Sequence, residues 1–491
     1  MADKNDANSD KVLANFDADK LRELIERLGA QVVSDPLQSK LEREEAAERT
    51  AVHEFWRTQP VPKSDDVVKK DGPLHPPLPL EKIPKEPHEL PEGMEWCTVD
   101  ATDDGELKEL YALLLNNYVE DGDAMFRFNY PLELLRWVMM PPGFNREWHV
   151  GVRRRETREL IAFVSGIPVD VMVRDKTITM AEINLLCVHK TLRNQRMAPL
   201  LIQEVTRRVH LVGIFQALYT AGRLLPKPVA TCRYYHRSLN PKKLVDIGFS
   251  APVDGAKLAR LTAKMRLPSA TSVPGLRAMR KGDVAQVRKL LNRFLKTRYD
   301  VVPVYRTDAE VAHWLLPRED VVWSYVVDDP DHPGRITDFF SFFSLPSQAL
   351  KPGARGRASA GKKPAGKKTA GASGPVSLNA AYVYYYATKT DYDVVLTAEE
   401  RAGCDGAKQE KALLRQKENA LLGARLVQLY GDALVLAKNG GFDVFNCLDM
   451  MDNELFTDEL KFGRGDGYLR YYFYNYMARD MPPGKIGLVM L

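Results

Sequence analysis

The stretch ITMAEINLLCVHKTLRNQRMAPLLIQEVTRRV, residues 178–209, constrains the fold more than any other part of the sequence. Residues 178–188 are mostly apolar, which is typical of a buried strand. Apolar residues then recur at helical spacing over 198–209, and Pro199 stands near the first turn, where a helix tolerates proline. The pattern predicts a buried strand, a basic turn and a helix, and so an α/β fold.

A weak internal repeat extends this prediction to the rest of the chain. WCTVDATDDGELKELYALLLNNYV, which starts at Trp96, reads as a strand, an Asp-rich cap and an amphipathic helix. LRAMRKGDVAQVRKLLNRFL, which starts at Leu276, repeats the same order. Such self-similarity predicts two related αβ halves, 95–270 and 271–491.

The flanking segments and insertions have different compositions. Residues 1–50 have mixed charge and are expected to form a flexible appendage, whereas 51–94 contain too many prolines for a helix or central strand and should form an extended arm. Two insertions interrupt the second half. Residues 351–376 are rich in Gly, Ala, Ser, Pro and Lys and should form a disordered loop, and residues 397–422 look helical.

The charge distribution argues against a nucleic-acid-binding body. The formal net charge is +5, but residues 351–375 hold seven Lys and Arg and no acid, so the remainder sums to 5 − 7 = −2. That block is either a solvated loop or a tether to the ribosome.

The five cysteines are scattered and predict neither disulfides nor a zinc site. The sequence also shows neither a membrane-spanning run nor a leader. A cytoplasmic protein is therefore expected.

The turn Arg193-Asn194-Gln195-Arg196 is a candidate phosphate site. A helix N-terminus offers free backbone N–H groups and a positive dipole end, and the two arginines add charge. The spacing resembles the pyrophosphate turn of acetyl-CoA-dependent N-acetyltransferases. An ordinary exposed basic turn is the alternative.

The glycine-rich stretch KFGRGDG, Lys461 to Gly467, is a second candidate site. Its lysine precedes the glycines and no Gly-Lys-Ser/Thr follows, which disfavours a nucleotide P-loop. The composition alone favours a tight hairpin with glycines at positive φ. Asp466 is then either a turn residue or a carboxylate aimed into a cleft.

Both motifs carry a resemblance to a known family. EINLLCVHK (Glu182 to Lys190) and KFGRGDG resemble the two signatures of the glycylpeptide N-myristoyltransferases. EFWRTQPVPK, NNYVEDGDAMFRF, TRRV, YTAG, TCRYYHRSLNPKKL, DALVLAKNGGFDVFN and the apolar C-terminus resemble further blocks. The blocks run in the family's order from Glu54 to Leu491.

This resemblance implies an enzyme that transfers myristate from myristoyl-CoA to the α-amino group of an N-terminal glycine. It also implies two fused acetyltransferase-like (GNAT) halves related by pseudo-twofold symmetry around a saddle-shaped mixed sheet. Myristoyl-CoA would be a co-substrate, without a prosthetic group or metal. The implied partners are nascent or cleaved proteins with N-terminal glycine, with possible ribosome association, no DNA and no transmembrane segment, for a cytoplasmic monomer.

The resemblance also assigns the catalytic groups. An α-ammonium has a pKa near ~8 and must lose a proton before it attacks a thioester. In this family the terminal carboxylate is the base, which would place Leu491, at the end of the strand-like run GKIGLVML, in the active site. The oxyanion donors would be the backbone N–H groups of Leu185, where the family usually has Phe, and Leu186, freed by a break in the strand beside Asn184. Thr220 would orient the amine with Asn184.

The resemblance implies two binding surfaces. The myristoyl-CoA set is His53, Glu54, Phe55, Trp56, Leu185, Leu186, Cys187, Val188, Arg193, Asn194, Gln195, Arg196, Met197 and Ala198. The peptide set is Tyr118, Asp121, Asp123, Phe126, Phe128, Tyr130, Thr220, Tyr234, His236, Ser347, Tyr382, Asp466 and Leu491. From residue type alone, Phe55 and Trp56 could instead pack on the surface, and His236 is a hydrogen-bonding wall, not the base.

Two other functions stay open on the sequence. One is an acyl-CoA N-acyltransferase of the same GNAT-like fold with a shorter acyl preference. The other is a catalytically silent module that binds lipidated peptides. An extra residue after Leu491 would discriminate the second, because binding should tolerate it and catalysis by the terminal carboxylate should not.

Overall fold

A computed structural model describes residues 54–119, 125–193, 195–350, 376–390 and 394–491. The predicted appendage 1–50 and almost all of the basic insertion 351–376 lie outside the described residues. The strands are β1 (Met94–Thr98), β2 (Phe126–Phe128), β3 (His149–Arg154), β4 (Leu160–Val173), β5 (Lys176–Val188), β6 (Ala217–Ala221), β7 (Ala230–Ser238), β8 (Leu276–Ala278), β9 (Val301–Pro303), β10 (Val322–Asp328), β11 (Ile336–Ser344), β12 (Ser347–Ala349), β13 (Ser377–Leu378), β14 (Ala380–Thr388), β15 (Val444–Leu448) and β16 (Gly463–Tyr474). The helices are α4 (Glu54–Thr58), α5 (Asp104–Asn117), α6 (Leu132–Met139), α7 (Met197–His210), α8 (Pro241–Asp246), α9 (Gly255–Lys264), α10 (Val284–Arg298), α11 (Asp308–Leu315), α13 (Ala398–Ala402), α14 (Ala407–Asn439) and α15 (Glu454–Thr457).

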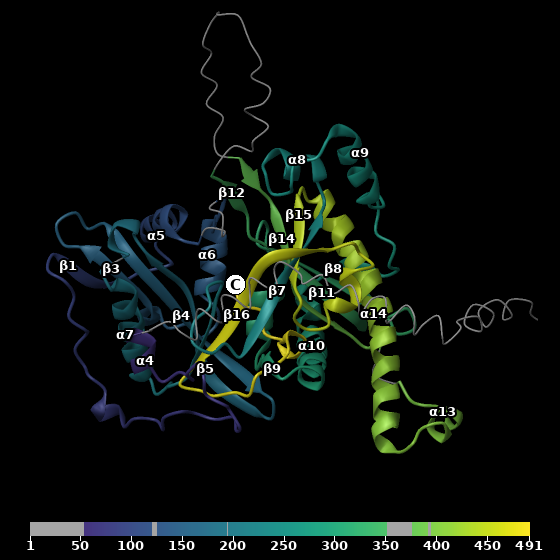
Figure 1. Cartoon of the computed structure of the whole chain (residues 1–491), viewed down its shortest axis with the longest axis horizontal. Helices are drawn as coiled ribbons and strands as arrows, with labels where there is room; N and C mark the ends of the chain where they lie inside the picture. Colours follow the sequence, from purple (N-terminus) through teal and green to yellow (C-terminus); the bar gives the residue numbers. More distant parts are fainter. Residues whose placement is uncertain (1–53, 120–124, 194, 351–375, 391–393) are drawn as a thin grey trace, which may run out of the picture. The chain divides into compact units, whose positions relative to one another are not determined.

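One large mixed sheet organises the described residues. Its strand order is β1-β3-β4-β5-β6-β16-β7-β15-β14-β11-β10-β8, with β9 paired to β4, and a small second sheet has the order β13-β12-β2. Most neighbours are antiparallel, but β5 pairs with β6 and β14 with β15 in parallel. Figure 1 shows β16, in yellow, between the blue strands of the first half and the green strands of the second. The predicted mixed α/β fold class is confirmed.

The two halves repeat one order of elements. In the first, the antiparallel strands β3, β4 and β5 lead through α7 to the parallel strand β6. In the second, β10, β11 and β14 lead through α13 and α14 to the parallel strand β15. This repeated order agrees with the internal repeat in the sequence, while the domain boundary at 270/271 stays a prediction.

The strand-turn-helix pattern is confirmed closely. The predicted strand 178–188 is part of β5, and the predicted helix 198–209 is α7, which begins one residue earlier and ends one residue later. The insertion 397–422 is helical, as expected, and forms α13 and the first half of α14.

Two local predictions are wrong. KFGRGDG forms no tight hairpin, because Gly463 begins the long strand β16, whose register against β7 is irregular between Arg464 and Tyr468. The apolar C-terminal run is also not a strand. Ile486 makes an isolated bridge to Val301, and no strand is assigned after it in the described C-terminal segment.

The Pro-rich arm is fixed to the first half by an ion-pair cluster on α7. The Arg207 guanidinium is paired with the buried carboxylate of Glu204 at 2.7 Å and donates to the backbone carbonyls of Pro84 and Lys85. The same carboxylate accepts from the backbone N–H of His88. These bonds supply polar partners that an extended, proline-rich segment cannot supply itself.

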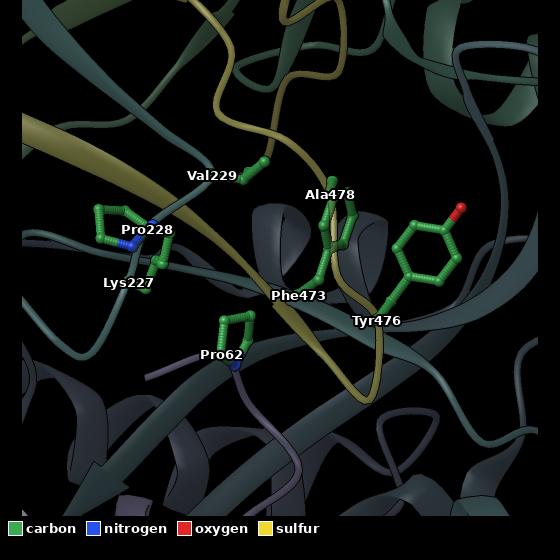
Figure 2. A pocket seen from close by; sticks show the side chains of 7 residues that line it. All are labelled: Pro62, Lys227, Pro228, Val229, Phe473, Tyr476 and Ala478. Carbon is green, nitrogen blue, oxygen red and sulfur yellow. The ribbon is translucent and has the colours of Figure 1, made fainter. Parts of the chain in front are cut away.

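A small hollow lies where the arm meets the sheet. Figure 2 shows Pro62 of the arm facing Pro228 and Phe473, with Tyr476 at one side. The cavity measures ≈ 10 Å³, which is room for about one water molecule. It is therefore a packing defect under the arm and too small for an acyl chain or a peptide.

Helix α14 is long and apolar enough to cross a membrane by length and composition. Half of its most apolar window is buried inside the protein. Core helices pass the same test, so this is weak evidence for a membrane span.

Candidate active site

A bulge interrupts β5 at the predicted oxyanion site. The pairing with β4 slips by one residue between Asn184 and Cys187, so that Leu185 and Leu186 face a single residue of β4. Leu185 has φ +56°, a left-handed conformation that a branched residue seldom adopts. The Ser165 hydroxyl donates to the Asn184 carbonyl at 3.1 Å and holds the ladder beside the bulge.

The bulge turns a backbone donor away from the ladder. Burial raises the pKa of the Tyr118 hydroxyl, and the nearby Leu185 N–H opposes that shift. A donor placed in this way beside a strand break can meet the oxygen of a thioester carbonyl instead of a neighbouring strand. The position of the bulge matches the predicted break beside Asn184.

Asn184 and Thr220 lie where two strands part. The parallel pairing of β5 with β6 ends at the pair Ile183 and Tyr219, one residue before each of them. On its other side β6 stays paired with β16, where Thr220 is opposite Tyr471. The two predicted amine-orienting side chains therefore stand together at the opening between β5 and β6.

The C-terminal run is pinned by the surrounding strands. Its backbone exchanges hydrogen bonds with the start of β9, since Asp300 N–H donates to Lys485 and Gly487 N–H donates to the Val301 carbonyl at 2.7 Å. Further along, the Val489 N–H donates to the Tyr385 hydroxyl at 3.0 Å. The end of the run is thus held against the second half of the sheet.

Burial of this run explains its apolar composition. Ile486, Leu488 and Met490 are each at most 6% exposed, and the half-buried Leu491 packs against the main core cluster. A Cβ on Gly487 would lie 2.6 Å from the Tyr299 ring, so only glycine permits the close approach. In Figure 1 the C label lies near β16, over the middle of the sheet.

Two predicted parts of the CoA site meet. The guanidinium of Arg196, at the start of α7, pairs with the carboxylate of Glu54 on α4 at 2.9 Å, and both side chains are exposed. Trp56 stacks on Tyr219 of β6 with ring centroids 5.7 Å apart. The short helix of the arm is therefore held over the basic turn, and Trp56 packs on the sheet, while its role at the CoA site stays a prediction.

The basic turn itself is anchored to the end of α5. Arg193 donates to the Asn117 carbonyl at the end of α5 at 2.6 Å, and the Lys190 N–H donates to the Asn117 side chain at 3.0 Å. Gln195 and Arg196 are exposed, Met197 is buried, and Ala198 is half-buried in the first turn of α7. Two predicted CoA residues, His53 and Asn194, lie outside the described residues.

Two side chains of the predicted peptide set, Tyr382 and His236, share one row across the sheet. Tyr382 of β14 is paired with Asn446 of β15, Asn446 with His236 of β7, and His236 with Gly463 of β16. His236 Nδ1 and Asn446 Oδ1 are 2.7 Å apart, and burial lowers the pKa of His236 despite that bond and the charge of Asp466. A neutral His236 fits a hydrogen-bonding wall better than a base.

The remaining described peptide residues lie on or beside β2 and β12 of the small sheet and on β7 and β16 of the large sheet. Tyr118 and Tyr130 form an edge-to-face pair with centroids 5.5 Å apart, and Phe128 packs against Tyr130 at 6.3 Å. The main-chain register pairs Ser347 of β12 with Phe128 of β2. Phe126 and Tyr130 are buried, Tyr234 stacks on His236, Asp466 is exposed, and Asp121 and Asp123 lie outside the described residues.

Cys187 has the properties of a core thiol. It is 3% exposed, and burial raises its pKa to about 12, although Arg193 opposes the shift. A thiol that stays protonated is a poor nucleophile. Among the described residues, no group of three or more His, Cys, Asp and Glu side chains is arranged to hold a metal ion.

The sequence interpretation gave no role to Glu182, which the structure places beside Asn184. Its carboxylate is buried and accepts from the Asn184 amide at 2.9 Å. The sequence signal that could have identified Glu182 is that it is the lone acid in the apolar run 178–188. Asn446 and Tyr385 were missed for a different reason, because only long-range contacts bring them to the site: strand pairing for Asn446 and the bond to Val489 for Tyr385.

Two family models match the sequence. The N-terminal domain of myristoyl-CoA:protein N-myristoyltransferase matches residues 73–232, and the C-terminal domain of the same protein matches residues 246–359 and 370–489. Together the matches include β5, α7, β14, β15, β16 and most of the C-terminal run, whereas most of β7 lies between the two matches.

Relatives and solved structures agree with these matches. A glycylpeptide N-tetradecanoyltransferase of Schizosaccharomyces pombe is 43% identical over 490 residues, which cover 98% of this chain and 94% of the relative. Glycylpeptide N-tetradecanoyltransferase 1 of Arabidopsis thaliana is 44% identical over 444 residues, 89% of each chain. A crystal structure of Saccharomyces cerevisiae N-myristoyltransferase with bound myristoyl-CoA matches with a TM-score of 0.78 at 40% identity, over 89% of this chain and 99% of that chain.

Proposed function

This chain belongs to the myristoyl-CoA:protein N-myristoyltransferase family, and we infer that it is an acyltransferase that moves myristate from myristoyl-CoA to an N-terminal glycine. Its relatives are named for this reaction, and a similar yeast structure holds myristoyl-CoA. One observation carries the inference to this site. The bulge at Leu185 lies beside the opening between β5 and β6, where Asn184 and Thr220 stand.

We propose a direct transfer with the terminal carboxylate of Leu491 as the base. This carboxylate takes a proton from the α-ammonium of the glycine, and the neutral amine attacks the thioester carbonyl carbon. A C–N bond forms and the C–S bond breaks, so that the products are the amide, the CoA thiol and one proton. The pinning of Val489 by Tyr385, two residues before the end, supports this role because it fixes the path of the terminal residues.

The oxyanion that develops on the thioester is the second requirement of this mechanism. We propose the Leu185 and Leu186 N–H groups as its donors. Loss of one such donor typically costs about 2.7–4 kcal/mol of transition-state stabilisation. A backbone donor is insensitive to the side chain at position 185, so leucine can serve there in place of the family's usual phenylalanine.

Glycine selectivity follows from the same geometry. A Cβ on the first residue would occupy space that the amine needs as it approaches the thioester between β5 and β6. Asp466 and the acidic residues of the peptide set would favour basic residues further along the peptide. We therefore propose nascent or newly cleaved proteins with N-terminal glycine as the substrates.

The test of this function is acyl transfer in vitro. Purified full-length protein is incubated with myristoyl-CoA and a glycine-first peptide or its alanine-first counterpart, and the acylated peptide is measured. Transfer to the glycine peptide alone supports the function. Each buried methylene contributes about 0.8 kcal/mol, so a site built for myristate should prefer it over a chain two carbons shorter by roughly tenfold. The opposite preference, for the shorter chain, would favour the short-chain alternative.

Cellular context is a separate proposal. We propose that the enzyme acts as a monomer in the cytoplasm and that the seven basic residues of 351–375 attract it to ribosomes. The test is ribosome co-sedimentation with and without this segment over a range of salt. Binding that is lost without the segment, and weakened by salt, is expected, and binding independent of both would contradict the tether.

A further inference from the structure

Glu182 is a buried acid at the centre of the site that the proposed mechanism does not use. It is 8% exposed, and the Asn184 Nδ2 group donates to its Oε1 at 2.9 Å. Within the described residues, no Lys, Arg or His forms an ion pair with this carboxylate. A buried carboxyl without a cation costs stability, and a residue that served only packing would avoid that cost.

The hydrogen bond decides which way the Asn184 amide points. An amide has an NH₂ group that donates and an oxygen that accepts. Since Glu182 holds the NH₂ group, the Oδ1 of Asn184 is left to accept from another donor. The α-amine of a glycine substrate is such a donor.

The backbone of Asn184 is fixed as firmly as its side chain. The Ser165 hydroxyl donates to its carbonyl oxygen, and the bulge at Leu185 follows immediately. Asn184 and Thr220 each follow the last pair of β5 and β6, at the opening between the two strands. An amide that is held at both ends presents its oxygen at a defined position.

Glu182 also faces the elements that hold the C-terminal run. Burial raises the pKa of Tyr385, whose hydroxyl accepts from the Val489 N–H, and the charge of Glu182 raises it further. Electrostatic interactions with Glu182 also reach three other buried tyrosines: Tyr305, Tyr384 and Tyr471. The acid thus lies near a group of buried tyrosines, one of which holds the C-terminal run.

We propose that Glu182 is a positioning residue for the acyl transfer, holding the Asn184 amide so that its oxygen receives the substrate amine. The role rests on the proposed function. Glu182 takes no proton from the substrate, because the terminal carboxylate does so. Burial raises the pKa of Glu182 to about 7, but its carbonyl oxygen accepts from Asn184 in either protonation state.

A double-substitution cycle tests this role. Single-turnover rates are measured for the unsubstituted enzyme, Glu182→Leu, Asn184→Leu and the double variant, with myristoyl-CoA and a glycine-first peptide. Glu182→Leu is expected to lower the rate by about 10²-fold, the scale of a misplaced reacting group, without changing myristoyl-CoA affinity. The double variant should be no slower than Asn184→Leu, because Glu182 acts only through Asn184.

Glu182→Gln is the conservative variant. Its side-chain oxygen can accept the same hydrogen bond, so its rate should recover towards that of the unsubstituted enzyme. If Glu182→Leu does not fold, Glu182→Met, with an unbranched chain, carries the cycle. Losses that multiply in the double variant, or a leucine variant with an unchanged rate, would overturn the role. An unsubstituted enzyme that transfers no myristate would overturn the proposed function, and this role with it.

Discussion

The backbone N–H of Val489 donates a 3.0 Å hydrogen bond to the hydroxyl of Tyr385 on β14. This bond joins the C-terminal run to a tyrosine that also interacts with Glu182, the partner of Asn184. The proposed base and the amine-orienting amide therefore belong to one connected set of groups.

Glu182 should make stability depend on pH. Burial raises its pKa from 4.5 to about 7, so between these values the folded state holds a proton that the unfolded state has lost. The free energy of unfolding should therefore fall as pH rises through this window. Relative to the unsubstituted protein, Glu182→Gln should gain about 2–3 kcal/mol between about pH 5 and about pH 8. Denaturant titrations at both pH values measure this gain, and a pH-independent difference would contradict it.

Arg196→Ala should weaken binding of myristoyl-CoA. The side chain is exposed and paired only on the surface with Glu54, so its loss should leave the melting temperature unchanged. Loss of one charge-assisted bond to phosphate corresponds to roughly a tenfold higher Kd. Arg158→Ala removes a similarly exposed arginine paired with Glu95 and is the control for charge, with unchanged affinity expected. Equal effects of the two variants in isothermal titration would argue against a phosphate site at the turn.

Gly487→Ala should disturb the C-terminal run. The added Cβ would lie 2.6 Å from the Tyr299 ring and 2.8 Å from Val302, and overpacking of this kind costs about 1–3 kcal/mol. We expect a lower melting temperature and a slower transfer rate with unchanged affinity for myristoyl-CoA. Gly282→Ala, where a Cβ meets no atom within 4 Å, is the matched control. A transfer rate that survives Gly487→Ala would show that the path of the terminal run is not critical.

Cys187→Ala should keep its transfer rate. Direct transfer needs no acyl-enzyme, and a thiol with a pKa of about 12 is protonated at neutral pH. Cys447→Ala, at another buried thiol, controls for the loss of core volume. Intact-mass measurement during the first turnover should find no acylated protein, and an acyl adduct that depends on Cys187 would refute direct transfer.

Local patterns predicted some elements because the relevant interactions are local. The apolar run of β5 and the helical spacing of α7 are properties of adjacent residues, so the strand-turn-helix unit could be read directly. The glycines of KFGRGDG misled for a different reason. Gly465 is required because a Cβ would lie 2.4 Å from His236 Nε2, a contact made by strand pairing and not by a turn.

The residues of the site could likewise be predicted from the sequence only where a local motif marked them. The family motifs gave Asn184, Leu185 and Thr220, whose positions at the bulge and strand opening agree with their implied roles. The sequence could not show that Glu182 faces Asn184, since the pattern of a lone acid in a strand is also that of a side chain pointing to solvent. It also could not show that the terminal run would be held by Tyr385, which lies over 100 residues away.

The terminal carboxylate is the central claim, and its position can be changed without touching any other residue. Deletion of Leu491 would move the carboxylate back by about 3.3–3.6 Å, and one added glycine would replace it with an amide and move the charge outward. Single-turnover transfer from myristoyl-CoA to a glycine-first peptide is the measurement, with myristoyl-CoA affinity as the check on folding. Both variants should bind the co-substrate normally and lose most of their transfer rate. Normal transfer by either variant would contradict the role of this carboxylate as the base.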